Sequence, residues 1–147
     1  MKQTIWDETA RRSMVERVSH VTPDAHGRWG RMTPHDMLAH LTDYARMALG
    51  ELPVRGAHVP LRYPPIRQLV IYALPMPRNV PTLRALVSRT TTDWGEEMGT
   101  LCHAIDRLAA RKEGELPEHP AFGRLSHRAW GVLLYRHMDH HLRQFGV

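Results

Sequence analysis

The stretch SHRAWGVLLYRHMDHHLRQFGV, residues Ser126–Val147, decides the fold of this chain. On a helix of 3.6 residues per turn, residues that are three or four positions apart share one face. That face is made up of Trp130, Leu134, His137, His141, Gln144 and Phe145. Such spacing is typical of a helix that turns an apolar face towards a core. The stretch therefore predicts a C-terminal amphipathic helix whose buried line includes two histidines.

His137 and His141 lie one helical turn apart on this line. Side chains at that spacing have Cβ atoms about 5–6 Å apart, which is close enough to share one cation. A buried imidazole without a partner costs about 1–3 kcal/mol, and a divalent metal ion would be a partner for both rings. The alternative is a pair of solvated histidines near a helix C-terminus, where the helix dipole favours positive charge.

A single domain, residues 1–147, is expected, because the chain is long enough to bury one core without disulfides. The only cysteine, Cys102, excludes an intrachain disulfide and favours a reducing cytoplasm. The N-terminus lacks the apolar run of a signal peptide. The longest apolar stretch, Leu69–Met76, contains Pro75 and is too short to span a bilayer. We expect a cytoplasmic protein with no membrane partner.

The formal charge of +5 raises the question of nucleic acid as a partner. The arginines are spread along the chain, however, and no basic block interleaved with aromatic residues is present. The sequence therefore argues against nucleic-acid binding. The 11 histidines, about 7% of the chain, are the more unusual feature of the composition.

Three further amphipathic helices are predicted, at about residues 4–20, 33–49 and 92–111. The second has the clearest start, because Thr33 can serve as N-cap and Pro34 fits the first helical position. Asp36 follows where the exposed N–H groups favour an anion, and Gly50 ends the helix. His40 lies within its apolar line, where an ordinary core histidine is the alternative to a metal ligand.

Seven prolines between residues 51 and 81 exclude a long continuous helix there. A short helix is predicted at 66–73, residues 83–87 are ambiguous in type, and the rest is expected to be an irregular crossover. In the helix that follows, Cys102 is expected to be a small buried hydrophobe rather than a ligand or nucleophile. The predicted fold class is all-α, an antiparallel four-helix bundle with a long proline-rich crossover between its second and third helices.

Two motifs lie near the ends of this arrangement. The first is WGRMTPHDMLAH at Trp29–His40, and the second combines HPAFG at His119–Gly123 with Trp130 and with HMDHHLRQFG at His137–Gly146. With these motifs the chain resembles the DinB-like (or YfiT-like) superfamily of metal-binding four-helix bundles, and within it an uncharacterised branch. The order of elements agrees along nearly the whole chain, although the proline-rich middle contributes little.

The resemblance implies a divalent metal ion, usually zinc or nickel. Carried onto this chain, its ligands are His40, His137 and His141, here called the histidine triad. Three imidazoles leave a coordination position open, which is typical of catalytic zinc sites. A ligand histidine usually donates its other N–H to a nearby acceptor. The candidates for such a supporting role are Asp43, which is better placed than Asp139, and Gln144. His140 points about 100° around the helix and is either a supporting or a surface residue.

By the same resemblance, we expect a small metalloenzyme that acts on a small-molecule substrate. Characterised relatives include thiol-dependent S-transferases and a mycothiol-dependent isomerase, so a low-molecular-weight thiol is a further candidate cofactor. Metal-dependent hydrolysis is equally open. The alternative function is a non-catalytic metal-binding or stress-response protein, which a fourth ligand such as Cys102 or His103 would favour. Many members are dimers, and a homodimer is the expected assembly.

Overall fold

The computed structural model describes residues 1–80 and 93–147, and the regular structure in these ranges is helical, without a β-strand. The four longest helices are α1 (Glu8–Ser19), α2 (Pro34–Ala48), α4 (Trp94–Ala109) and α5 (His127–Gln144). Three short helical segments are η1 (Pro60–Arg62), α3 (Ile66–Gln68) and η2 (Leu69–Ala73). The predicted all-α class is confirmed for these ranges. No helix described in them is long and apolar enough to cross a membrane.

Side-chain caps determine where the two best-predicted helices begin. The Thr33 hydroxyl accepts a hydrogen bond from the backbone N–H of Asp36, whose carboxylate accepts one from the Thr33 N–H. This reciprocal pair satisfies two N–H groups that the first turn of α2 leaves open. The Ser126 hydroxyl caps α5 by accepting a hydrogen bond from the N–H of Ala129, without a reciprocal bond. Gly50, just after α2, has a φ of 80°, which a glycine adopts without strain.

The first helix is shorter than predicted, because its N-cap is Asp7. The residues before it cross α5 instead, and the Ile5 N–H donates to the carbonyl oxygen of Gly131 at 3.1 Å. Trp6, which lies within the predicted helix at 4–20, instead stacks on the ring of His127 with centroids 4.2 Å apart. The N-terminal residues are thus held to α5 by an aromatic pair and a backbone hydrogen bond.

We expect the substitution Gly131→Ala to lower the free energy of unfolding by about 1–3 kcal/mol, the usual cost of overpacking. A Cβ atom at this position would overlap the indole ring of Trp6. Urea unfolding of both proteins measures the difference. The matched control is Gly99→Ala in α4, where an added Cβ meets nothing within 4 Å. That change should raise the unfolding free energy by about 0.5–1 kcal/mol, through helix propensity. Equal effects of the two substitutions would contradict this packing.

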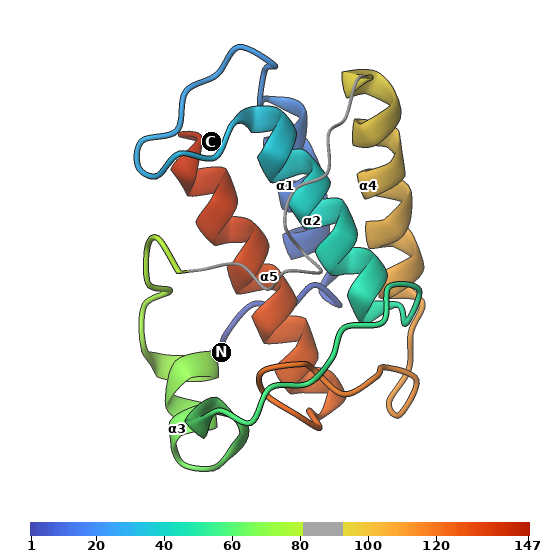
Figure 1. Cartoon of the computed structure of the whole chain (residues 1–147). Coiled ribbons are helices and arrows are strands. Elements are labelled where there is room, and N and C mark those ends of the chain that lie inside the picture. The colour runs from blue at the N-terminus through green and yellow to red at the C-terminus, as the bar shows by residue number, and fades with distance from the viewer. Residues whose placement is uncertain (81–92) are drawn as a thin grey trace.

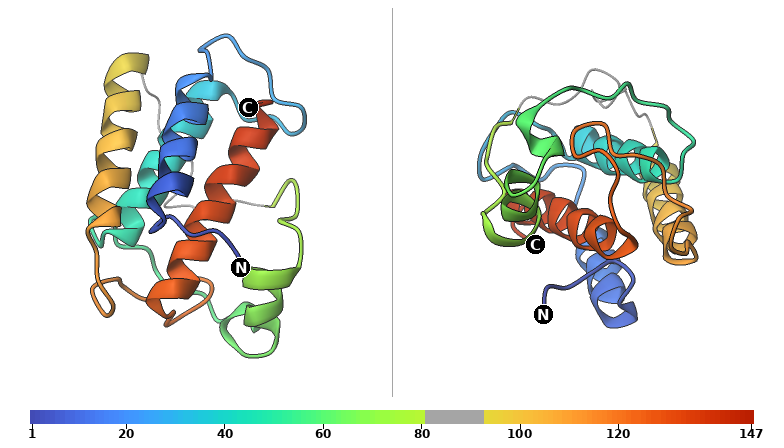
Figure 2. Two further views of the ribbon diagram at one scale, coloured as in Figure 1. Left: turned by 180° about the vertical axis from the view of Figure 1, so that it is seen from behind. Right: turned by 90° about the horizontal axis from the view of Figure 1, so that it is seen from below.

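The four long helices share one buried core. In Figures 1 and 2, α2 lies alongside α4, and α1 lies against α5. The core is built from apolar side chains of all four helices, among them Met14, Val18, Leu38, Leu41, Leu101, Ile105, Trp130 and Leu134. Cys102 is only partly buried, which corrects the expectation that it lies inside the core. It lies at the edge of the buried face of α4, one residue after the fully buried Leu101.

A second apolar cluster attaches the short helices to α5. It contains Ile71, Phe122, Ala129, Val132 and Leu133, and the α3–η2 segment lies on the side of α5 away from α4 (Figure 2). The predicted short helix at 66–73 is therefore present, as α3 and η2. The ambiguous residues 83–87 lie outside the described residues, so the expected crossover between α2 and α4 is described only in part.

Candidate metal centre

The structure brings the three predicted ligands together. His40 comes from the middle of α2, and His137 and His141 come from one face of α5. One ring nitrogen of each residue lies within 4.8 Å of the corresponding atoms of the other two. The Nε2 atoms of His40 and His137 are 3.1 Å apart. The two helices thus place the three histidines in one cluster that could hold a metal ion.

The chemical state of His141 follows from a hydrogen-bonded chain. The Gln144 side-chain nitrogen donates to the carbonyl oxygen of Trp29 at 3.0 Å. Its amide oxygen is 3.0 Å from Nδ1 of His141, and an amide oxygen can only accept. Nδ1 therefore carries the hydrogen, and the lone pair of His141 is on Nε2. An imidazole with one nitrogen held in this way is prepared to use the other as a metal ligand.

The motif around Trp29 has a structural role that the sequence does not reveal. The backbone N–H of Arg28 donates to the carbonyl oxygen of Gln144. Gly30, with a φ of 74°, lies so close that an added Cβ would be 3.1 Å from the Gln144 side-chain nitrogen. The segment therefore packs tightly around the glutamine that orients His141. The prediction that Gln144 supports the site agrees with this geometry.

Burial keeps two histidines of the triad, His137 and His141, neutral. Burial lowers the pKa of His141 to about 3, and the nearby His40 contributes in the same direction. Burial also lowers the pKa of His137 well below its ordinary value, with further contributions from His141 and His40. At neutral pH these two rings are therefore uncharged, which is the form of imidazole that binds metals.

The donor set suits a divalent ion. Nitrogen ligands at about 2.0–2.1 Å from a tetrahedral zinc ion are about 3.3 Å apart, close to the separation of His40 and His137. His137 also has a buried Nδ1 atom with no hydrogen-bond partner in the described parts of the chain. An unpaired buried nitrogen is costly, and this ring gains only one polar neighbour from the protein described here. A cation bound at Nε2 of His137 would hold the ring in place, although it would not pair the Nδ1 atom.

A second buried pair, Tyr44 and His119, lies next to the triad. The Nδ1 atom of His119 accepts hydrogen bonds from the N–H groups of Ala121 and Phe122. The neutral ring therefore carries its hydrogen on Nε2, which donates to the Tyr44 hydroxyl oxygen at 2.9 Å. Tyr44 in turn packs on His137 with ring centroids 4.0 Å apart. The sequence identifies His119 only as part of a motif, and the motif HPAFG is the signal that could have identified this role.

His119 makes the stability of the protein depend on pH. Burial, and to a smaller extent Arg62, lowers its pKa from 6.5 to about 3. Between those values the unfolded chain binds a proton that the folded chain does not, so the unfolding free energy falls as the pH falls. The expected slope from this residue is about 1.4 kcal/mol per pH unit below pH 6.5. Urea unfolding of metal-free wild type and His119→Phe between pH 5 and 6.5 should show a smaller slope in the variant. Equal slopes would contradict this assignment.

The remaining candidate residues lie around the triad rather than in it. Asp43 is buried on α2, and its carboxylate lies 3.6 Å from the guanidinium of Arg46. Asp139 faces α1, where its carboxylate pairs with Arg17 at 2.8 Å. His140 is partly buried on the neighbouring face of α5, with its ring 5.3 Å from that of His141. Cys102 and His103 are absent from the cluster of potential ligands found in the described ranges.

Comparison with known proteins gives one match. Residues 72–146, about half of the chain, match the model of a family described as protein of unknown function (DUF1569). The matched range includes His137 and His141, and His40 lies before it. No curated protein and no solved structure matches the chain.

Proposed function

We propose that this protein, which belongs to the DUF1569 family, binds one divalent metal ion through the histidine triad and uses it in catalysis. The observation that carries the proposal is the convergence of three ring nitrogens, within 4.8 Å of one another, from two different helices. The hydrogen bond from His141 to Gln144 supports the proposal. It fixes the ring hydrogen on Nδ1 and so leaves the lone pair of His141 on Nε2, where a metal ion can bind.

Buried side chains surround the triad, among them Tyr44 and His119. When bound, a divalent ion with an open coordination position acts as a Lewis acid, and it lowers the pKa of a water or thiol that it holds. Burial raises the pKa of Tyr44, so its hydroxyl keeps its proton. Since that oxygen accepts from His119, its own hydrogen is available to a ligand beside the triad. Tyr44 is thus a candidate hydrogen-bond donor to substrate.

We also infer that the chain is a four-helix bundle of the DinB-like type. The support is the packing of α1, α2, α4 and α5 around one core, together with ligands on the second and last of these helices. For that type of bundle we propose thiol-dependent transfer or metal-dependent hydrolysis on a small molecule. Zinc and nickel are the proposed ions, because neutral imidazoles suit both.

A non-catalytic metal-binding protein is the second candidate function. A structural zinc site usually has four protein ligands, whereas the cluster found in the described residues has three. This difference favours catalysis. Catalytic turnover that depends on the bound metal would support the enzyme and contradict the non-catalytic metal-binding protein.

The test begins with tag-free protein stripped of metal by a chelator. Titration with zinc, and separately with nickel, against a competing chromophoric chelator should give one equivalent bound per chain. Two activity screens follow, one for conjugation of thiols to a halogenated electrophile and one for hydrolysis of activated esters. Metal-dependent turnover that is lost in the variant His137→Ala/His141→Ala supports an enzyme. One equivalent bound without turnover in either screen supports the second candidate, and no binding contradicts both.

A further inference from the structure

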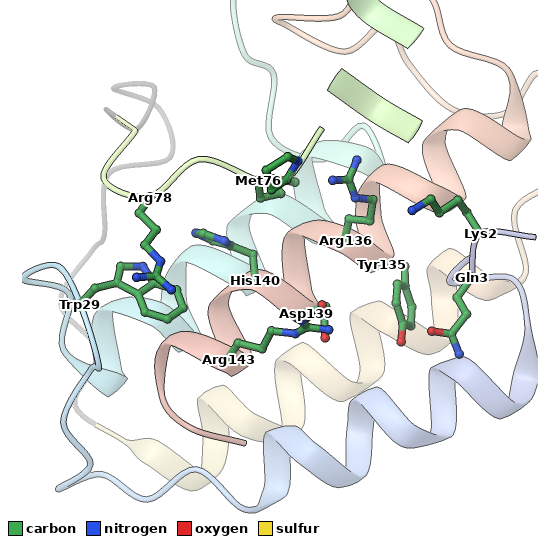
Figure 3. A pocket seen from close by; sticks show the side chains of 11 residues that line it. Lys2, Gln3, Trp29, Met76, Arg78, Tyr135, Arg136, Asp139, His140 and Arg143 are labelled. Atoms are coloured by element: carbon green, nitrogen blue, oxygen red, sulfur yellow. Dashed lines mark ion pairs between the residues drawn. The ribbon is translucent and has the colours of Figure 1, made fainter. Parts of the chain in front are cut away.

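A basic pocket of about 460 Å³ lies along α5, beside the face that carries the triad (Figure 3). Its walls come from α5, from the N-terminal residues, from Trp29 before α2 and from the segment that follows η2. Four basic side chains line it, namely Lys2, Arg78, Arg136 and Arg143. This volume is within the range of sites that hold small molecules.

The positive charge of the basic pocket is not balanced by the protein around it. Asp139 is the one acidic residue among the lining residues, and its carboxylate already pairs with Arg143 at 2.9 Å and with Arg17 at 2.8 Å. In the described ranges, the charges of Lys2, Arg78 and Arg136 form no ion pair. Like charges gathered around one cavity repel one another and raise the local concentration of anions.

Two of these cations are held in place before any ligand arrives. The guanidinium of Arg136 donates to the carbonyl oxygens of Val70, at 2.8 Å, Ile71 and Leu74. The guanidinium of Arg78 lies over the ring of Trp29, 4.2 Å from its centroid. Figure 3 shows Arg78 by Trp29 at one end of the pocket, with Arg136 farther along it. Cations that are already positioned lose less entropy on binding, and a guanidinium matches the oxygens of a phosphate or carboxylate.

Much of the remaining wall is apolar, beside the polar side chains of Gln3 and His140. Pro75, Met76 and Tyr135 line the pocket together with Trp29. We propose that the basic pocket binds a small organic anion, whose phosphate or carboxylate group is attracted by the unpaired cations along the pocket and whose compact apolar part packs against these side chains. The proposal does not depend on a metal ion in the triad.

Calorimetry on the metal-free, tag-free full chain tests the proposal, with phenyl phosphate and benzoate as probes. Saturable 1:1 binding of either probe supports the proposal, and the preferred probe identifies the acid group. Inorganic phosphate should bind about tenfold more weakly than phenyl phosphate, because it buries no apolar surface. Absence of saturable binding for both organic probes would overturn the proposal.

Matched variants locate the binding. Lys2→Gln/Arg78→Gln removes two unpaired and exposed cations of the pocket, and it should weaken binding at least about tenfold. The control, Arg12→Gln/Arg55→Gln, removes two exposed arginines that do not line the pocket, so the net charge falls equally. The control should bind like wild type. Equal weakening in both variants would show a general charge effect and overturn the assignment of the pocket.

Discussion

His141→Ala should weaken the binding of zinc or nickel by well over 100-fold, since it removes one of three ligands. The loss should exceed the roughly 10–100-fold that is typical when a residue supporting a ligand is removed. The small side chain leaves the helix intact, because alanine is the best helix former. Competition titration of metal-free wild type and variant measures the difference in affinity directly.

The control for this prediction is His103→Ala, in which an exposed histidine of α4 is removed. Its affinity for metal should equal that of wild type. Far-ultraviolet circular dichroism should show the same helix content in all three proteins. If His141→Ala keeps wild-type affinity while folded, the triad is not the metal site.

Gln144→Leu should weaken metal binding by about 10–100-fold without removing a ligand. The substitution removes both the acceptor that fixes the hydrogen on Nδ1 of His141 and the donor to the carbonyl oxygen of Trp29. His141 can then rotate or place its hydrogen on Nε2, and either change removes the lone pair from the site. The same competition titration measures the effect.

Gln144→Glu provides the rescue for this prediction. A carboxylate still accepts from the Nδ1 hydrogen of His141, although it no longer donates to Trp29. Affinity should therefore recover most of the loss seen in Gln144→Leu. Gln68→Leu, an exposed glutamine on α3, is the control and should have no effect. Equal affinities of wild type and Gln144→Leu would mean that the amide does not orient the ligand.

Local features of the sequence predict most of the helical structure. Thr33 and Ser126 cap their helices as expected, because a cap depends only on residues within one turn. The first helix begins later than expected, since Trp6 packs on His127 of α5 instead of forming part of the first helix. A periodic pattern indicates which face is buried, but it does not reveal which partner covers it.

The candidate site is predictable where it depends on spacing and less so where it depends on distant contacts. His137 and His141 share one face through the period of one helix, whereas the position of His40 in its helix fits an ordinary core histidine as well as a ligand. The partners of Tyr44 and Gln144 are 75 and 115 residues away in the chain, and no local pattern encodes those contacts. The basic pocket is likewise missed, because its cations come from three separate segments.

The metal content of the untagged protein tests the central claim most directly. We would purify wild type and His137→Ala/His141→Ala side by side and measure bound metals by inductively coupled plasma mass spectrometry. The account predicts close to one equivalent of a divalent metal per wild-type chain, and almost none in the variant. No metal in folded wild type, even after incubation with zinc and with nickel, would contradict it.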